Sequence, residues 1–246
     1  MVGSQDSIAQ PNVVLNTIVA EAFAEACDVL EKADDFDMAV HDLIKEYATE
    51  HQRIVFNGNG YSDEWVAEAE RRGLPNIRSM VDAIPALNTE KSVKLFEKFK
   101  VFTKAELDSR VEIEYETYSK EINIEARAAI DIATKQIIPA VIHYTTVLAD
   151  SINAVKAAGV TEVSVQAELL KKCSALLKET NEAMHTLSAL VVKIPEVAEG
   201  RDRAVYCREQ IVKAMDALRK PVDELEMLVD KSMWPMPSYG DLIFEV

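Results

Sequence analysis

Apolar residues recur every three to four positions over most of the chain, which is the spacing of amphipathic α-helices. The first such stretch, residues 12–30, begins at Asn12, whose side chain can cap a helix. Its apolar stripe consists of Leu15, Ile18, Val19, Ala22, Phe23, Ala26, Val29 and Leu30. Asp34 or Asp35 is the predicted cap of a second helix. The apolar stripe of this helix consists of Phe36, Val40, Leu43, Ile44 and Tyr47. The pattern predicts two helices, each with one face to bury.

The period changes at residues 53–56, Arg-Ile-Val-Phe, a short run with two β-branched residues. The sequence Asn-Gly-Asn-Gly follows it at residues 57–60. This composition predicts one short strand that runs into a tight turn. Three short helices are predicted next, at residues 62–72, 79–87 and 89–100. Gly73 and Pro75 end the first of them.

Three long helices are predicted for the second half of the chain. Thr103 and Glu106 form a capping box that starts the longest, which runs to about Ala158 with an interruption at Pro139. The next helix begins after Gly159 and ends near residue 194, and the third follows Pro195. Short connections favour antiparallel neighbours, so residues 128–231 are predicted to form an up-down-up bundle.

Pro221 and the tail complete the pattern. Pro221 is expected to bend or divide the third long helix. Residues 233–240, Met-Trp-Pro-Met-Pro-Ser-Tyr-Gly, are expected to be non-helical, and residues 242–244 to form a strand-like apolar end. The predicted fold class is therefore mostly α, with one short strand near 53–56.

Charge and cysteine content narrow the class of protein. The chain has 42 acidic and 27 basic residues, a net charge of −15, which repels nucleic acid and anionic lipid. No apolar run approaches the roughly 18 residues that a membrane span needs. Cys27, Cys173 and Cys207 lack metal-ligand or redox spacing, and we expect them to be small, buried, reduced side chains. These features predict a soluble cytoplasmic protein without nucleic-acid or membrane partners.

Two motifs allow a chemical interpretation beside a structural one. The Asn-Gly-Asn-Gly loop could cradle a phosphate, but it lacks the lysine and spacing of known phosphate loops, so a turn that needs positive φ is favoured. Glu182 and His185 have the spacing found in di-iron helices. A second Glu-x-x-His motif is missing, so a solvated pair is favoured over a metal site.

The remaining acidic motif and the nucleophiles give no active site. Glu112, Glu114 and Glu116 would be spread around a helix, which favours a solvated acidic face over an acid–base pair. No serine or cysteine lies in a nucleophile-elbow motif. The residues themselves therefore predict a helical scaffold with no catalytic, cofactor-binding or metal-binding side chains.

Several segments together resemble the type III branch of glutamine synthetases. They are the opening Met-Val-Gly-Ser-Gln, residues 11–21, residues 53–62 with 72–76, residues 85–87, 102–103, 118–120 and 124–126, and the terminal motif 234–244. The resemblance covers essentially the whole chain. It implies that residues 1–127 are the C-terminal segment of a catalytic domain of α+β type, and that residues 128–246 are a type-specific helical extension with its tail.

The resemblance also implies an activity whose catalytic residues this chain is expected to lack. The family condenses glutamate and ammonia to glutamine through a γ-glutamyl phosphate, using ATP and divalent metals such as magnesium or manganese. In the family a metal-binding glutamate and a substrate-binding arginine lie just before the position of Met1, so neither maps onto this chain. The expected role is to support the catalytic barrel and to help assemble the ring-shaped homo-oligomer of synthetase subunits.

Met1 matches an internal methionine of the family, which suggests a truncated or split reading frame. The apolar stripe of residues 15–30 and residues 53–56 are then expected to pack against barrel parts that lie outside this chain. The alternative is a non-enzymatic helical module that docks on a full-length synthetase. The DNA upstream of Met1 would distinguish the two.

Overall fold

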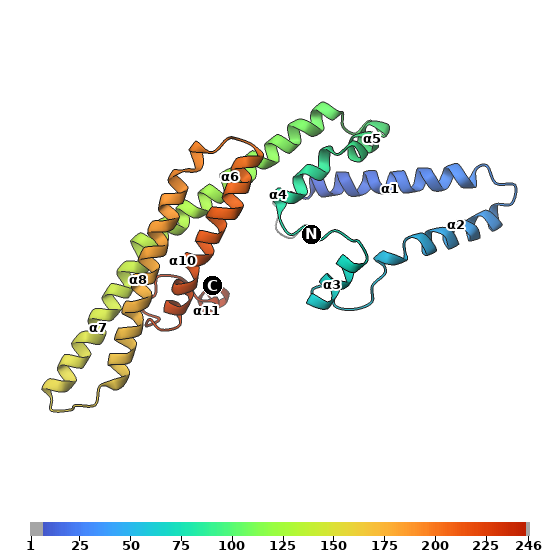
Figure 1. The fold of residues 1–246 in the computed structure, drawn as a ribbon. Helices are drawn as coiled ribbons and strands as arrows, with labels where there is room; N and C mark the ends of the chain where they lie inside the picture. The colour runs from blue at the N-terminus through green and yellow to red at the C-terminus, as the bar shows by residue number, and fades with distance from the viewer. Residues whose placement is uncertain (1–6, 245–246) are drawn as a thin grey trace. The chain divides into compact units, whose positions relative to one another are not determined.

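A computed structural model describes residues 7–244, which form parts of two compact units, Met1–Val111 and Glu112–Val246. One helix, α6, begins in the first unit and continues into the second (Figure 1). The elements that lie in the first unit, with the start of α6, are α1 (Ala9–Leu30), α2 (Phe36–Glu50), a 3-10 turn (Gln52–Ile54), α3 (Asp63–Arg71), α4 (Met80–Ala83), a second 3-10 turn (Ile84–Asn88) and α5 (Glu90–Lys98).

Side-chain caps explain where the short helices of the first unit begin. The Asp35 carboxylate accepts a hydrogen bond from the amide of Met38 (3.0 Å), and the Ser62 hydroxyl accepts one from Trp65 (3.3 Å). Gly73, with φ of 70°, follows α3 in the left-handed conformation that glycine adopts without strain. These starts and the stop confirm the sequence predictions. The predicted Asn12 cap is wrong, because α1 begins one turn earlier, at Ala9.

The predicted strand at residues 53–56 is also wrong. Residues 52–54 form a 3-10 turn, residues 55–57 have no regular structure, and residues 7–244 contain no strand. The Arg72 guanidinium donates to the carbonyl oxygens of Arg53 (3.2 Å) and Val55 (2.8 Å). A side chain from α3 thus satisfies main-chain acceptors that a neighbouring strand would otherwise bond.

The second unit is an antiparallel three-helix bundle, as predicted (Figure 1). Its helices pack in sequence order, the second between the first and the third, over short connections. Its elements are the rest of α6 (Lys104–Ile132), a π-helical segment (Ala133–Ile137), α7 (Ile138–Ala157), α8 (Ser164–Val192), a 3-10 turn (Ile194–Glu196), α9 (Arg201–Tyr206), a second π-helical segment (Cys207–Val212), α10 (Lys213–Glu226) and α11 (Tyr239–Phe244).

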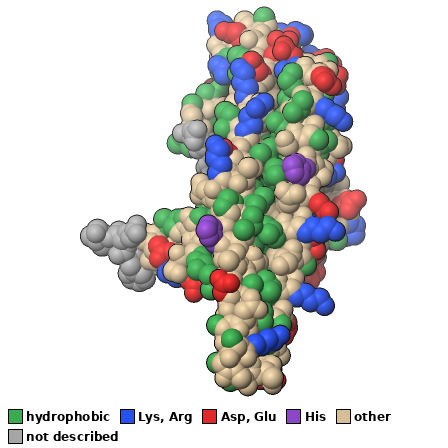
Figure 2. All heavy atoms as spheres, turned by 90° about the vertical axis from the view of Figure 1, so that its left-hand side faces the viewer, with side chains coloured by type: hydrophobic (Ala, Val, Ile, Leu, Met, Phe, Trp, Pro, Cys, Tyr) green, Lys and Arg blue, Asp and Glu red, His purple; other side chains and the backbone are tan. Residues whose placement is uncertain are grey.

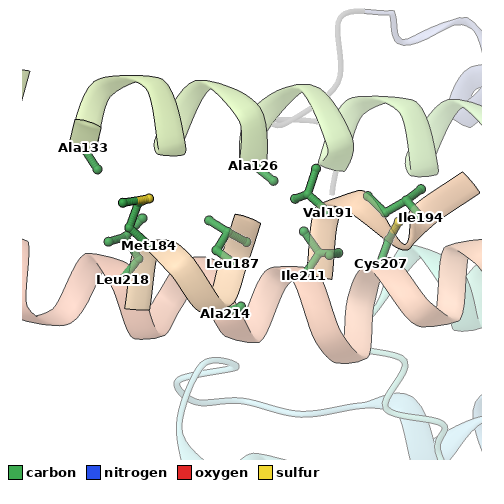
Figure 3. Close-up of a cluster of buried hydrophobic side chains, with 10 residues drawn as sticks. All are labelled: Ala126, Ala133, Met184, Leu187, Val191, Ile194, Cys207, Ile211, Ala214 and Leu218. Carbon is green, nitrogen blue, oxygen red and sulfur yellow. The ribbon is translucent and has the colours of Figure 1, made fainter. Parts of the chain in front are cut away.

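Two apolar clusters fill the bundle. In the first, Ala126 and Ala133 project from the α6 side toward residues of α8 and α10 (Figure 3). The buried members of the second cluster are Ile137, Val141, Cys173, Leu176, Leu225 and Val229. Outside these clusters, charged side chains of both signs are interspersed with apolar ones on the side of the molecule drawn in Figure 2. The bundle therefore buries its own apolar stripes.

Neither internal proline divides its helix. Pro139 has no amide proton to donate to the preceding turn. Residues 133–137, just before α7, form a π-helix, so the helical stretch from α6 to α7 stays continuous. Pro221 is buried inside α10, which continues to Glu226. The predicted interruption at Pro139 thus takes the form of a π-helical segment.

The tail folds back onto the bundle. Trp234 packs against the second apolar cluster, and the Lys231 ammonium bonds the Asp241 carboxylate at 2.8 Å. Asp241 also accepts from the amide of Ser238 (2.7 Å) at the start of α11. The predicted strand-like end at 242–244 is wrong, because these residues lie in α11. Of the helices described, none combines the length and the apolarity that crossing a bilayer requires.

Candidate functional site

The most prominent surface feature of the first unit is the outward apolar face of α1. Along this face Leu15, Ile18, Val19, Phe23 and Val29 are exposed, and Phe23 is 68% exposed. The spacing of these residues makes them neighbours on one side of the helix. We call this set the α1 face.

The opposite side of α1, which contains Thr17 and Glu21 among small apolar residues, is the one that packs within the unit. Thr17 is buried and donates its hydroxyl proton to the carbonyl of Val13 (2.7 Å). Glu21 accepts a bond from the Lys98 ammonium of α5 at 2.5 Å, and this carboxylate contributes to raising the pKa of Lys98. The helix therefore packs through the side that contains Thr17 and Glu21 and leaves its stripe of large apolar side chains uncovered within the described chain.

Further apolar side chains of the first unit are exposed as well. Helix α2 has no buried residue, and Phe36, Met38 and Ile44 are 57–63% exposed. Ile54 and Val55, in the segment predicted as a strand, are also exposed. The run of exposed apolar side chains along α1 is of the kind that marks contacts with other protein surfaces.

The loop at residues 57–60 does not form a phosphate cradle. Ser62 already caps α3, and the acidic Asp63 and Glu64 occupy its first turn, where they oppose an anion. The favoured interpretation, a turn with positive φ, is wrong, because neither Gly58 nor Gly60 has positive φ. Gly58 instead makes room for the ring of Phe56, since an added Cβ would lie 2.7 Å from its Cζ atom.

A compact aromatic and ionic cluster holds this loop against α3. Phe56 stacks on Trp65 with ring centroids 4.0 Å apart, and the Arg72 guanidinium lies 5.5 Å from the Trp65 ring. Hydrogen bonds from Arg71 and Arg72 lower the pKa of Glu68 to about 2. This cluster was not predicted from the sequence. Its only sequence signal is the i, i+3 and i, i+4 spacing of Glu68 with the two arginines.

The two predicted metal candidates lie on one helix and face solvent. Glu182 and His185 are both exposed on α8, and the Glu182 carboxylate pairs with Lys178 at 3.7 Å. Over residues 7–244, no three His, Cys, Asp or Glu side chains come together in a way that could hold a metal ion. The ligand set of this part of the chain therefore does not fit the divalent metals of the family, and we derive no catalytic step through them.

The other candidates have structural surroundings. Glu112 and Glu116 are exposed on α6, where Glu116 pairs with Lys120 at 2.6 Å, while Glu114 is half-buried. Cys173 and Cys207 are buried, and desolvation raises the pKa of both thiols. The expectation of a buried thiol is wrong for Cys27, which is exposed on α1.

The comparisons with known proteins agree on one family. The model of the glutamine synthetase C-terminal domain matches residues 39–156, a range that runs from the first unit into the second. The chain is 31% identical to the type-3 glutamine synthetase of Dictyostelium discoideum over 99% of its own length and 34% of that protein. It is 33% identical to a glutamine synthetase of Butyrivibrio fibrisolvens over 87% of its length and 31% of that protein.

The chain thus spans about a third of the length of these relatives. The predicted division at 127/128 into a catalytic segment and an extension stays a prediction. The compact units reflect how the chain packs, and they do not show which residues belong to a catalytic domain and which to a type-specific extension. The family resemblance stated from the motifs is confirmed over nearly the whole chain. This chain belongs to the glutamine synthetase family and corresponds to a C-terminal part of a type-3 enzyme.

Proposed function

We propose that this chain is the non-catalytic helical part of a type-3 glutamine synthetase, which condenses glutamate and ammonia to glutamine with ATP. The rest of the enzyme then binds ATP and the magnesium or manganese ions. Residues 1–127 close the catalytic domain, and residues 128–246 form the type-specific extension with its tail. By itself the chain is inactive. The assignment is supported by the length of the relatives, of which this chain covers about a third.

The α1 face is the observation that carries the proposal. We infer that it packs against the catalytic remainder of the synthetase, because the relatives are about three times as long as this chain. Burying a large apolar side chain contributes about 1.5–3 kcal/mol. Leu15, Ile18, Val19 and Phe23 are 49–68% exposed, so burying what is exposed of them would contribute roughly 3–7 kcal/mol, before the cost of association is subtracted.

Assembly and location follow from the same proposal. The subunits form the ring-shaped homo-oligomer expected for the family, and the bundle contributes to contacts in that assembly. A cytoplasmic location is supported by three cysteines that are all free thiols in the structure. Nucleic acid and anionic membranes remain unsuitable partners, because the net charge is −15.

Fragment complementation tests the proposal. The part of the Dictyostelium discoideum relative that this chain does not match is produced alone, mixed with this chain, and assayed for binding and for glutamine formation. The proposal predicts a complex of the two chains, with activity that neither has separately. No complex at any tested concentration would contradict it.

A parallel mixture with the intact relative distinguishes the regulatory alternative. An intact synthetase already carries its own C-terminal part, which occupies the surface that the α1 face would contact. The proposal therefore predicts binding to the incomplete enzyme and none to the intact one. Binding to the intact enzyme would instead favour a free-standing regulator.

A further inference from the structure

The loop at residues 57–60 contains two Asn-Gly pairs in succession, a sequence with a specific chemical liability. The amide nitrogen of the residue after an asparagine can attack the asparagine side chain and expel ammonia. Glycine in that following position favours the attack, because it has no Cβ to crowd the nitrogen and leaves the main chain free to reach the required dihedral angles. The structure treats the two pairs differently.

Asn57 has the freedom that the reaction needs. It is exposed and outside regular structure, and within the described chain neither its side chain nor the Gly58 amide has a hydrogen-bond partner. Position 58 favours glycine, because a Cβ atom added there would lie 2.7 Å from Cζ of Phe56. The ring of Phe56 is in turn held by stacking on Trp65.

Asn59 is held at both its side chain and its main chain. Its side-chain oxygen accepts a hydrogen bond from the amide of Tyr61 (3.0 Å), and its carbonyl oxygen accepts one from the amide of Ser62 (3.2 Å). These bonds form the turn that leads into the cap of α3. Rotation of the Asn59 side chain toward the Gly60 nitrogen must break at least one of them.

We propose that Asn57 is a deamidation site of the folded protein and that the turn protects Asn59. Hydroxide removes the Gly58 amide proton, and the nitrogen bonds to Cγ of Asn57. The bond from Cγ to Nδ2 breaks, and ammonia leaves with a proton from water. Water then opens the cyclic imide at either carbonyl, which gives aspartate or isoaspartate, so the net reaction consumes one water and releases one ammonia.

The product changes the surface of the first unit. Aspartate or isoaspartate adds one negative charge at position 57, two residues from the exposed Val55. Isoaspartate also inserts a methylene group into the main chain between the Phe56 ring and the start of α3. The inference concerns the loop alone and does not depend on the proposed synthetase role.

The test follows both asparagines in one peptide. The intact chain is incubated in mildly alkaline buffer, and samples taken over time are digested with trypsin. Cleavage after Arg53 and Arg71 places both asparagines in the peptide 54–71, and tandem mass spectrometry assigns the replacement of the amide by a carboxyl to one or the other. We expect Asn59 to react roughly two- to tenfold more slowly than Asn57, the cost of opening one ordinary hydrogen bond.

Two controls make the result specific. In denaturant the turn is lost, so both asparagines are expected to react at similar rates. Asn57→Gln should abolish the fast reaction, and the matched Asn59→Gln should leave it unchanged. Equal rates in the folded chain, or a faster reaction at Asn59, would overturn the proposal. So would a folded chain in which Asn57 stays intact while the denatured chain reacts.

Discussion

The bundle offers a direct test of where its stability lies, through the substitution Leu187→Ala. Leu187 is completely buried in the first apolar cluster, beside Met184, Val191, Ile211 and Ala214 (Figure 3). Removing such a side chain leaves a cavity and costs about 2–5 kcal/mol of unfolding free energy. The folding equilibrium constant should therefore fall by a factor of roughly 30 to several thousand.

The matched control lies on the same helix. Val192 is 69% exposed, so Val192→Ala should change the free energy of unfolding by less than about 0.5 kcal/mol. Both substitutions are made in a Trp65→Phe background, which leaves Trp234 as the tryptophan that reports on the second unit. Urea titration followed by fluorescence then gives the unfolding midpoint of the bundle.

Leu187→Ala is expected to lower the unfolding midpoint by about 1–2 M urea. The slope of the unfolding free energy against urea concentration should not change, because it depends on the surface that unfolding exposes. Val192→Ala should leave the midpoint nearly where it was. If the two substitutions lowered the midpoint equally, the cluster around Leu187 would not be the stabilising core that the structure describes.

Three further predictions concern the tail, the thiols and the activity. Hydrogen bonds from Lys231 and Ser238 lower the pKa of Asp241 to about 2. The ionised Asp241 carboxylate therefore stabilises the tail above its ordinary pKa of 3.8, and this stabilisation is lost as the pH falls from 3.8 toward 2. Hydrogen exchange of α11 should become faster over that pH range, and Asp241→Asn should remove this pH dependence. In the native chain a thiol reagent should label Cys27 alone, and all three cysteines should react in urea; mass spectrometry that finds native label on Cys173 or Cys207 would contradict their burial. The purified chain should form no glutamine from glutamate, ammonia and ATP and carry no stoichiometric iron, manganese or zinc; turnover well above a blank, or about two irons per chain, would refute the scaffold assignment.

Local chemistry explains what the sequence predicted correctly. The side chains of Asp35 and Ser62 cap their helices by accepting hydrogen bonds from the amides three residues ahead. The start of such a helix can therefore be predicted from a few neighbouring residues. The capping box of Thr103 and Glu106 forms as predicted, with the Thr103 amide donating to the Glu106 carboxylate at 2.7 Å. The three long stripes likewise predict the bundle, because each repeats its period over many turns.

Three of the failures involve partners that are distant in the sequence. Residues 53–56 have strand composition, but a strand needs a neighbour, and Arg72 supplies the hydrogen bonds instead. The bond between Lys231 and Asp241 that accompanies α11 has no repeating pattern to predict it. For α1 the period shows which residues share a face, but it does not show that Thr17, and not Phe23, faces the unit.

The central claim is that the α1 face contacts the catalytic remainder of a synthetase, and a matched pair of substitutions tests it. Phe23 on α1 is 68% exposed and Val165 on α8 is 67% exposed. In the isolated chain, Phe23→Asp and Val165→Asp should each change the free energy of unfolding by less than about 0.5 kcal/mol.

The measurement is the affinity of each variant for the part of the Dictyostelium discoideum enzyme that this chain does not match. Because Phe23 is already about one-third buried, its burial at the contact is expected to contribute about 1–2 kcal/mol, so Phe23→Asp should weaken binding roughly 5- to 30-fold. Val165→Asp should bind as the unchanged chain does. If Phe23→Asp bound as tightly as Val165→Asp, the α1 face would not be the contact surface.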